Sequence, residues 1–444
     1  MAETGTLKPS ATPAPPARSR FQDVTRSLRH RNFQLFFSGQ LISLIGTWMD
    51  NIAEAWLVYR LTGSSLLLGT VAFAGQFPVF LCGPFGGLIA DRWNRRKIII
   101  VTQIASMILA SALAFLTLSK RITVNEVIVL AILTGIVNAV DIPTRQSFLV
   151  EMVGREDLMN AIALNSSMFN GARIIGPAIA GILVASIGEG WCFFANAVSY
   201  IAVIAGLLLM RVPHRKKEHH APPLEHLIEG FRYVRHTAPI RAVLLLLGGI
   251  SLVALPYSVL MPVFAARVLH GNARTLGLLM GATGVGALTG ALVLASRTKV
   301  QGLGRIIAIA CGSFGVCLVL FSQSRWTYLS ILLMAPVGFA MMTQMASSNT
   351  LIQAMVPDRL RGRTMAIYSM MFMGMAPIGS LLAGAMAARI GAPWTLTFGG
   401  SCAIAGAIAF WRYLPKIRVE ARELLVAQGI AGGEPAQEMT SRLS

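Results

Sequence analysis

Long apolar runs separated by short polar stretches make up most of the chain. A helix needs about 20 apolar residues to cross the hydrocarbon core of a membrane. Lipid cannot satisfy exposed backbone groups, so each run is expected to be a closed helix. The pattern predicts twelve such spans, near residues 33–59, 65–90, 97–118, 124–146, 160–186, 191–210, 241–266, 275–296, 304–322, 327–350, 364–388 and 393–414. We therefore expect an all-α membrane protein.

The longest polar interruption lies in the middle of the chain and divides the spans into two sets of six. We expect a linker there, with a helix at the membrane surface over 224–234, where apolar residues recur at helical spacing. The predicted segments are an N-terminal tail at 1–32, an N-terminal six-helix half at 33–210, the linker at 211–240, a C-terminal six-helix half at 241–414 and a C-terminal tail at 415–444.

The two halves also resemble each other in sequence. Residues 151–184 align without a gap on residues 354–387, which pairs the fifth span with the eleventh. The identical pairs include Phe169/Phe372, Gly171/Gly374, Gly176/Gly379 and Gly181/Gly384. Repetition between two six-helix halves is typical of transporters whose binding site lies where the halves meet.

Composition and charge agree with a membrane protein. Hydrophobic residues make up 55% of the 444 positions and charged residues 13%, whereas a soluble domain is about 25% charged. The net charge of +19 is high enough to suggest nucleic acid as a partner. However, Lys and Arg fall in short clusters between apolar runs, as they do in cytoplasmic loops. We expect both termini in the cytoplasm and no nucleic-acid partner.

The loop after the second span reads GLIADRWNRRK over residues 87–97. It resembles the signature G-x-L-A-D-R-x-G-R-R/K of the major facilitator superfamily, in the loop where that superfamily carries it. The matching residues are Gly87, Asp91, Arg92, Arg95 and Arg96. Asn94 replaces the usual Gly, and we expect it to adopt the left-handed turn, which Asn tolerates.

The resemblance implies that this loop is a cytoplasmic gate. Asp91 is expected to dock near the start of the eleventh span, where a helix N-terminus and Arg361 or Arg363 stabilise a carboxylate. Asp141, near the end of the fourth span, is expected to pair with Arg95 or Arg96. The alternative is a static scaffold.

The fifth span resembles the G-P-x-x-G-G motif of superfamily antiporters. It contains Gly171, Gly176, Pro177 and Gly181, with Ala180 in place of the first paired glycine. Segments at residues 31–36, 46–49, 56–59, 141–146 and 349–353 further resemble the bacterial branch that contains the enterobactin exporter and macrolide efflux proteins.

This resemblance implies proton-coupled export of a small amphipathic molecule, such as a siderophore or drug, by alternating access across the bacterial inner membrane. The partners it implies are the substrate, protons and the lipid bilayer. One alternative is uptake or uniport of a small metabolite. Another is a membrane-embedded sensor or enzyme, which requires a nucleophile, metal cluster or effector domain that the sequence does not offer.

Two carboxylates are candidates for proton coupling, because ionisable groups at membrane depth are costly and often functional. Asp50 and Glu54 lie four residues apart in the first span and therefore share one helical face. Partly desolvated carboxylates on one face suit a proton carrier. The alternative is that both stay hydrated in an outer vestibule or tie helix ends together.

Arg173 is the basic residue placed deepest in a predicted span, and it needs an acid, carbonyl groups or a cavity. We expect it to face a central cavity with Asp50 or an anionic substrate as its partner, the alternative being a fixed ion pair. Gln344 and Asn349, among the methionines of the tenth span, are candidates to line that cavity, although such residues are more often core or lipid-facing.

No cofactor or metal site is expected. Residues 281–286 resemble a nucleotide fingerprint, but they lie within an apolar span without a preceding strand. The chain has no phosphate-binding loop. A His-rich and Lys-rich stretch at residues 214–220 is interpreted as a solvated loop.

Overall fold

A computed structural model describes residues 26–154, 156–211, 223–297 and 300–428. The His-rich stretch at 214–220 and parts of both predicted tails and of the linker lie outside these residues. Within them the elements are η1 (Arg26–Arg29), α2 (Arg31–Thr62), α3 (Ser65–Arg92), α4 (Arg95–Leu118), α5 (Val124–Val153), α6 (Leu158–Ile187), α7 (Glu189–Leu209), α8 (Pro223–His236), α9 (Ala238–Val253), η2 (Leu255–Leu260), α10 (Met261–Val263), η3 (Phe264–Val268), α11 (Ala273–Ala295), α12 (Leu303–Gln323), α13 (Thr327–Met355), α14 (Asp358–Ser369), η4 (Met370–Gly374), α15 (Met375–Ile390) and α16 (Ala392–Ala427).

Eleven helical segments of the described chain are long and apolar enough to cross a membrane. The remaining long helix of the bundle, α2, has 32 residues and is more polar, since it carries Asp50 and Glu54 among others. The seventh span is the broken series from α9 to η3, and the eleventh runs from α14 to α15. The prediction of an all-α membrane protein with two six-helix halves is confirmed.

Some helices continue beyond the predicted spans. Helix α5 ends at Val153 and α16 at Ala427, past the expected limits of 146 and 414. The spans were predicted from the length of apolar runs, so each predicted span ends at the first charged residues. Glu, Arg, Leu and Ala are good helix formers, however, and they continue the helix beyond the hydrocarbon core. The segment predicted as a C-terminal tail therefore begins as helix.

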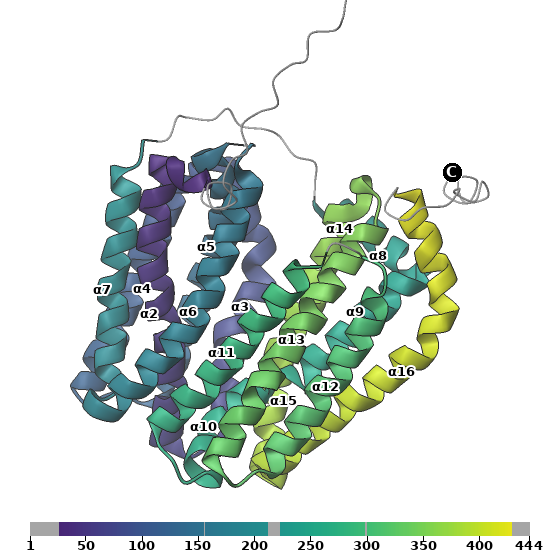
Figure 1. Ribbon diagram of the computed structural model, residues 1–444. Coiled ribbons are helices and arrows are strands. Elements are labelled where there is room, and N and C mark those ends of the chain that lie inside the picture. The colour runs from purple at the N-terminus through teal and green to yellow at the C-terminus, as the bar shows by residue number, and fades with distance from the viewer. Residues whose placement is uncertain (1–25, 155, 212–222, 298–299, 429–444) are drawn as a thin grey trace, which may run out of the picture.

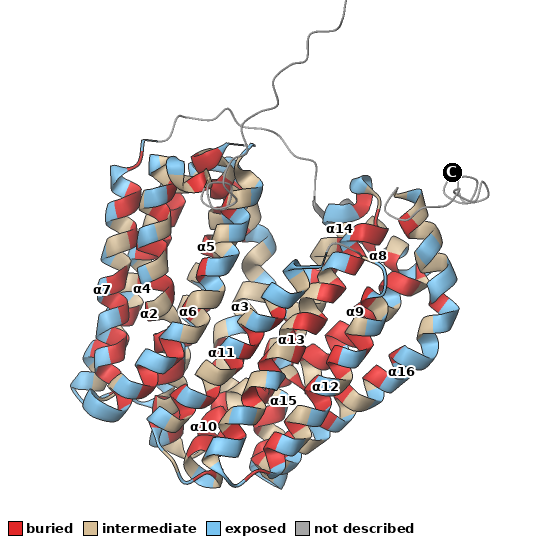
Figure 2. Cartoon of the chain, in the orientation of Figure 1, coloured by how far each residue is buried: buried red, intermediate tan, exposed pale blue. Residues whose placement is uncertain are grey.

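The helices form two bundles, α2 to α7 and α9 to α16 (Figure 1). Buried residues run along the inside of each bundle, as Figure 2 shows. Outward faces carry exposed apolar residues, such as Val101, Ile108 and Phe115 at seven-residue spacing on α4. This spacing keeps one helical stripe facing outward, as expected for a surface in contact with lipid.

The most extensive contacts between the two bundles are made by two helix pairs, α6 with α11 and α3 with α15. A Cβ placed on Gly181 of α6 would lie 3.0 Å from the Cα of Gly277 on α11. A Cβ on Gly69 of α3 would lie 3.1 Å from the Cα of Gly384 on α15. Glycines at both junctions therefore allow direct backbone contact between the halves, as small residues do in membrane helices.

The sequence repeat corresponds to equivalent packing in the two halves. In α6, the Cβ position of Gly176 meets α2 and that of Gly181 meets α11. In α15, the Cβ position of Gly379 meets the α9–η2 segment and that of Gly384 meets α3. Each repeat helix thus packs on the first helix of its own half and on the second helix of the other half.

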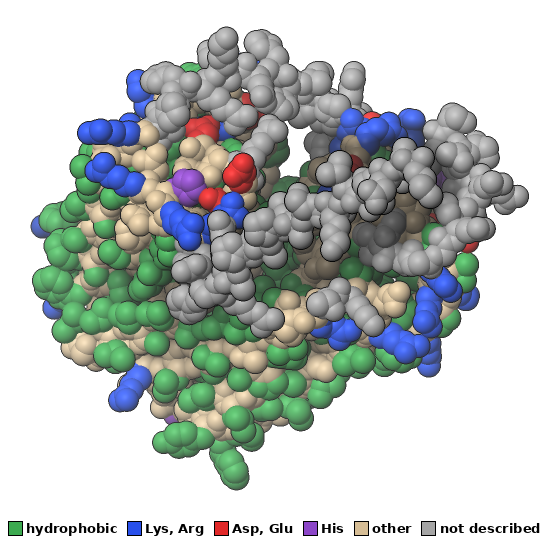
Figure 3. Space-filling view, turned by 45° about the horizontal axis from the view of Figure 1, so that its top comes forward, with side chains coloured by type: hydrophobic (Ala, Val, Ile, Leu, Met, Phe, Trp, Pro, Cys, Tyr) green, Lys and Arg blue, Asp and Glu red, His purple; other side chains and the backbone are tan. Residues whose placement is uncertain are grey.

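The halves separate toward the end where α2 begins and α16 ends, which we call the terminal end (Figure 1). Figure 3 looks onto that end and shows the surface hollowed between the bundles, with Lys and Arg side chains around it. The opposite end, called the distal end, is where the first residues of α3 pack on α15: a Cβ on Gly384 would lie 2.6 Å from the carbonyl oxygen of Ser65. The molecule is therefore open at the terminal end and closed at the distal end.

We expect Gly181→Val to lower the stability of the detergent-solubilised protein, because the new side chain forces α6 away from α11. Overpacking of this kind costs about 1–3 kcal/mol. Gly171→Val adds the same side chain to the same helix at a position where a Cβ meets nothing within 4 Å, so its effect is expected within about 0.5 kcal/mol. Thermal unfolding of both variants checks this, and equal losses would show that the glycine contact does not hold the halves together.

Candidate functional site

Asp50 lies on the face of α2 that packs against α7, and Glu54 is one turn further along the same face. The Asp50 carboxyl is within hydrogen-bonding reach of the Asn196 amide on α7, and the two carboxyl groups are close enough to interact electrostatically. Neither is in an ion pair in the described part of the chain. The shared helical face predicted from their spacing is therefore occupied by two carboxyl groups without a cation.

The packing of α2 on α7 excludes water from part of the Asp50 carboxyl. Its Oδ1 atom is buried and has no hydrogen-bond partner. A Cβ on Gly46 would lie 2.7 Å from the Asn196 Oδ1, so only glycine at this position allows the amide to approach α2. An ionised carboxylate with an unpartnered buried oxygen is unfavourable, and a proton bound there removes the unpaired charge.

Arg173 lies on the other side of α2. Its guanidinium stacks over the Trp48 ring at 5.6 Å from the centroid, and a Cβ on Gly176 would lie 2.5 Å from the Trp48 Cβ, so glycine lets α6 approach there. Trp48 and Asp50 are two residues apart, which places them about 200° apart around a helix of 3.6 residues per turn. The expected pairing of Arg173 with Asp50 is therefore wrong in this conformation, because α2 separates the two charges.

Arg173 also marks the junction between the halves. A Cβ on Gly284 of α11 would lie 3.0 Å from the Arg173 carbonyl oxygen. The hydroxyl of Tyr257, from η2 of the other half, is close enough to Arg173 for an electrostatic interaction and contacts the Met341 sulfur at 4.0 Å. Arg173 is half-buried and forms no ion pair within the described residues, so this cation is available to an anion at the junction.

The two candidates on α13 lie differently. Gln344 is 2% exposed and its Nε2 is 3.5 Å from the Ser348 Oγ of the same helix, so it does not face an open cavity here. Asn349 is half-buried and accepts a hydrogen bond from Gln353 at 2.6 Å. In the eleventh span, Met370, Met371 and Met373 belong to η4, a π-helical turn, and such turns often occur at functional sites.

The loop between α3 and α4 is held by Arg95. Its guanidinium is 3.2 Å from Asp91 and 2.8 Å from Glu151 of α5. Arg96 donates to the carbonyl oxygens of Leu207 and Leu208 at the end of α7, at 2.7 and 2.9 Å. A cation at that position also interacts favourably with the negative end of the helix dipole. Both arginines therefore tie the loop to the N-terminal half.

Asp141 does not pair with Arg95 or Arg96, contrary to the prediction. Its carboxylate is 2.6 Å from the Arg145 Nε and accepts hydrogen bonds from Thr102 at 2.7 Å and Gln103 at 3.1 Å. Because α5 continues to Val153, Asp141 lies well inside the helix, and Arg145 one turn later is the nearer cation. This buried network joins α5 to α4.

Two further expectations for the gate differ from the structure. Asp91 pairs with Arg95 and not with the start of the eleventh span, whose Arg359 and Arg363 instead contact Glu229 of α8. Asn94 has φ −69° and ψ 111°, so it is not left-handed. It is the N-cap of α4, and its side chain accepts a hydrogen bond from the Lys97 amide at 3.1 Å. Arg92 is exposed at the end of α3.

The motif glycines have separate roles. At Gly87 and Gly171 an added Cβ meets nothing within 4 Å, whereas at neighbouring Gly86 it would lie 2.0 Å from the Ala139 carbonyl oxygen. Gly86 therefore allows α3 to pack on α5, a role that the motif alone did not indicate. Pro177 contributes a carbonyl oxygen 2.6 Å from the Cβ position of Gly277.

Several residues of the site were missed from the sequence. Trp48 and Asn196 belong to apolar spans, and only their position opposite Arg173 and Asp50 in space reveals them. Glu151 and Glu229 are acids in amphipathic stretches, where a solvated role is the default. The sequence around each of them has about as many acids as arginines and therefore gave no signal of these ion pairs.

Comparison with known proteins identifies the family. Residues 25–429 match the family described as transmembrane secretion effector. The chain is 28% identical to the staphyloferrin A transporter of Staphylococcus aureus (87% of this chain, 98% of the relative). It is 26% identical to the multidrug efflux pump Tap of Mycolicibacterium fortuitum (84% and 93%) and 25% identical to the enterobactin exporter of Citrobacter koseri (81% and 86%).

Solved structures share the fold. The nucleoside transporter NupG superposes with a TM-score of 0.66 at 15% identity, covering 88% of this chain and 98% of its own. A bacterial homologue of the iron transporter ferroportin, in an inward-facing state, gives 0.66 at 15% identity, covering 86% and 98%. These relatives are membrane transporters and not enzymes. The chain belongs to the transmembrane secretion effector family of the major facilitator superfamily.

Proposed function

We propose that the chain is a proton-coupled exporter of a small, acidic, amphipathic molecule. The observation that carries this proposal is the separation of charge across α2. Asp50 and Glu54 lie on the side of α2 that faces α7, whereas Arg173, a residue of α6, contacts the opposite side of α2 through Trp48. None of the three has an oppositely charged partner among the described residues. Unpaired charges at membrane depth are costly, so protons stabilise the acids in one state of the cycle and a bound anion stabilises Arg173 in the other.

The distribution of cations supports a cytoplasmic terminal end. Arg92, Arg95, Arg96 and Lys97, then Arg359 and Arg361, lie at that end. The distal loops hold fewer cations, among them Lys120, Arg121 and Arg325. By the positive-inside rule the hollow of Figure 3 opens to the cytoplasm. The structure then corresponds to the inward-open state of an alternating-access cycle.

The depth of the charges suits that cycle. Arg173 lies 15 residues into α6, or about 22 Å from its start at 1.5 Å per residue, which is near the middle of a membrane. An acidic molecule entering from the cytoplasm meets this cation where the halves touch. Rocking of the halves about the glycine contacts would then turn the site outward, where protons reach Asp50 and Glu54.

The loop between α3 and α4 is proposed as the cytoplasmic gate. In the open state Asp91 is exposed on one half and the α14 arginines are held by Glu229 on the other. Closing the hollow brings these two regions together, so that the carboxylate of Asp91 can bind the start of α14. Asp141 and Arg145 stiffen α5 behind this loop.

The substrate class is proposed from Arg173 and the relatives. Two of the relatives named above carry staphyloferrin A and enterobactin in their names, and one is a multidrug pump. An unpaired guanidinium favours the acidic siderophores, since a cation at this depth would repel a cationic drug. The second candidate is drug export, supported by the aromatic and methionine side chains around the junction, Trp48, Tyr257 and Met341.

Proton coupling predicts that an acidic lumen drives enterobactin into liposomes that contain the purified protein. The double variant Asp50→Asn/Glu54→Gln is expected to lose this stimulation, at least about tenfold, because no carboxyl remains to carry the proton. It should retain exchange of labelled for unlabelled enterobactin, which needs no net proton movement. Glu156→Gln removes an acid whose side chain is 92% exposed and serves as the control.

Full stimulation in the double variant would contradict coupling through this pair. If the rate of transport by the wild type did not change with the proton gradient, uniport would be supported instead.

The role of Arg173 predicts a change in selectivity. Arg173→Gln is expected to raise KM for enterobactin at least about tenfold, since a charge-assisted contact to the anion is lost. Transport of erythromycin, a cationic drug, should stay the same or improve. Arg121→Gln, an exposed distal-loop residue, is the matched control. An equal loss for both compounds would show that Arg173 holds the helices and does not select the substrate.

A further inference from the structure

A groove on the C-terminal half is independent of the central hollow. It lies between α11 and α12 with α13 as its floor, and α13 packs against both. Its volume is about 470 Å³. Val293 and Leu294 at the end of α11 line it, with Arg297 just beyond that helix, and the lining of α12 begins at Ile306 in the first turn. The groove therefore begins at the terminal end and, with Cys317 and Pro336 in its lining, extends toward the middle of the membrane region.

Most of the lining is apolar, and its polar residues are Arg297, Ser313 and Thr343. Arg297 follows the C-cap of α11, and its side chain lines the groove. It takes part in no ion pair in the described ranges. The groove thus joins an apolar wall to an unpaired cation at the membrane surface, and such cations attract anionic lipid headgroups.

Thr343 closes the floor of the groove. The residue is only 8% exposed, and its hydroxyl is buried against α11, where a Cβ on Gly290 would lie 3.0 Å from the Oγ1 atom. The hydroxyl therefore faces the neighbouring helix, and the apolar part of the side chain faces the groove.

We propose that this groove binds an anionic phospholipid of the leaflet at the terminal end. The phosphate pairs with Arg297, and an acyl chain lies along the apolar wall. A volume of about 470 Å³ falls in the range of small-molecule pockets, about 300–1,000 Å³. Because α11 contacts the other half, a lipid bound here would make the position of α11 depend on the lipid composition of the membrane.

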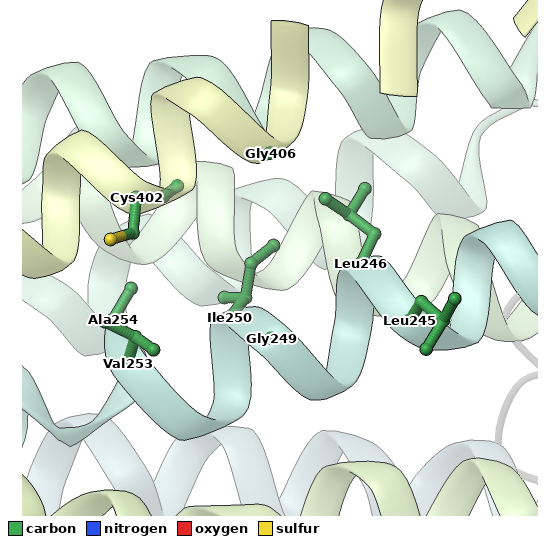
Figure 4. A pocket seen from close by; sticks show the side chains of 9 residues that line it. Leu245, Leu246, Gly249, Ile250, Val253, Ala254, Cys402 and Gly406 are labelled. Atoms are coloured by element: carbon green, nitrogen blue, oxygen red, sulfur yellow. The ribbon is translucent and has the colours of Figure 1, made fainter. Parts of the chain in front are cut away.

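A second groove contains no charged residue and is therefore expected to contact lipid without headgroup preference. It lies between α9 and α16, has a volume of about 180 Å³ and is lined by apolar side chains and glycines (Figure 4). Leu245, Ile250 and Cys402 line it, and no charged residue does. Nothing in it selects a headgroup, so it serves as the internal control.

Headgroup selection is tested by native mass spectrometry of the full chain in detergent, titrated with dioleoyl phosphatidylglycerol or dioleoyl phosphatidylcholine. The wild type is expected to bind phosphatidylglycerol about tenfold more tightly, because Arg297 attracts the net negative headgroup. Arg297→Gln should reduce this preference to about twofold or less. Arg305→Gln, an exposed arginine outside the groove, should leave it unchanged. Equal binding of both lipids to the wild type, or an unchanged preference in Arg297→Gln, would overturn the proposal.

Placement in the groove is tested with two variants. Ala310→Phe fills the groove and is expected to abolish the tight binding of phosphatidylglycerol. Gly249→Leu fills the control groove, where a Cβ meets nothing within 4 Å, and should change nothing. Unchanged binding in Ala310→Phe, displacement of the lipid by inorganic phosphate, or displacement by enterobactin would each overturn the proposal.

Discussion

Contact between backbones where the two halves meet is the constraint on which the rest of the structure depends. Gly181 faces Gly277, and Gly69 faces Gly384. Larger side chains at these positions would separate the halves and expose the interior to lipid. In a bilayer the hydrophobic effect does not drive helices together, so close packing of small residues must do so. Glycines at these contacts present no side chains that interlock, so one half can rock on the other without separating interdigitated side chains.

The same constraint positions the charges. Gly176 allows α6 to pack closely on α2 at Trp48, and Gly46 allows α7 to pack closely on α2 near Asp50. As a result α2 separates Arg173, at the junction of the halves, from the two carboxyl groups inside the N-terminal half. In the proposed alternating-access cycle, a movement of α2 would change the surroundings of both sites together. This coupling through one helix gives a physical route by which proton binding and substrate release can depend on each other.

The repeated architecture could be predicted from the sequence, and the charge pairs could not. The spans could be predicted from the length of the apolar runs, because the thickness of the hydrocarbon core sets that length. The Gly176/Gly379 and Gly181/Gly384 matches indicated that the two halves pack in equivalent ways. Helix ends were placed too early in α5 and α16, where charged residues continue the helix into water. The pairing of Asp141 with Arg145, and of Glu151 with Arg95, depends on distances in space. The spacing of Asp50 and Glu54 predicted their shared face but not that α2 would stand between them and Arg173.

Proton release on substrate binding tests the central claim most directly. Enterobactin is added to the purified, detergent-solubilised protein in weakly buffered solution, and the pH change is recorded beside binding. The account predicts proton release from the wild type and none from Asp50→Asn, although the variant still binds. Binding to the wild type without release of protons would contradict proton-coupled export and return Asp50 to a structural role.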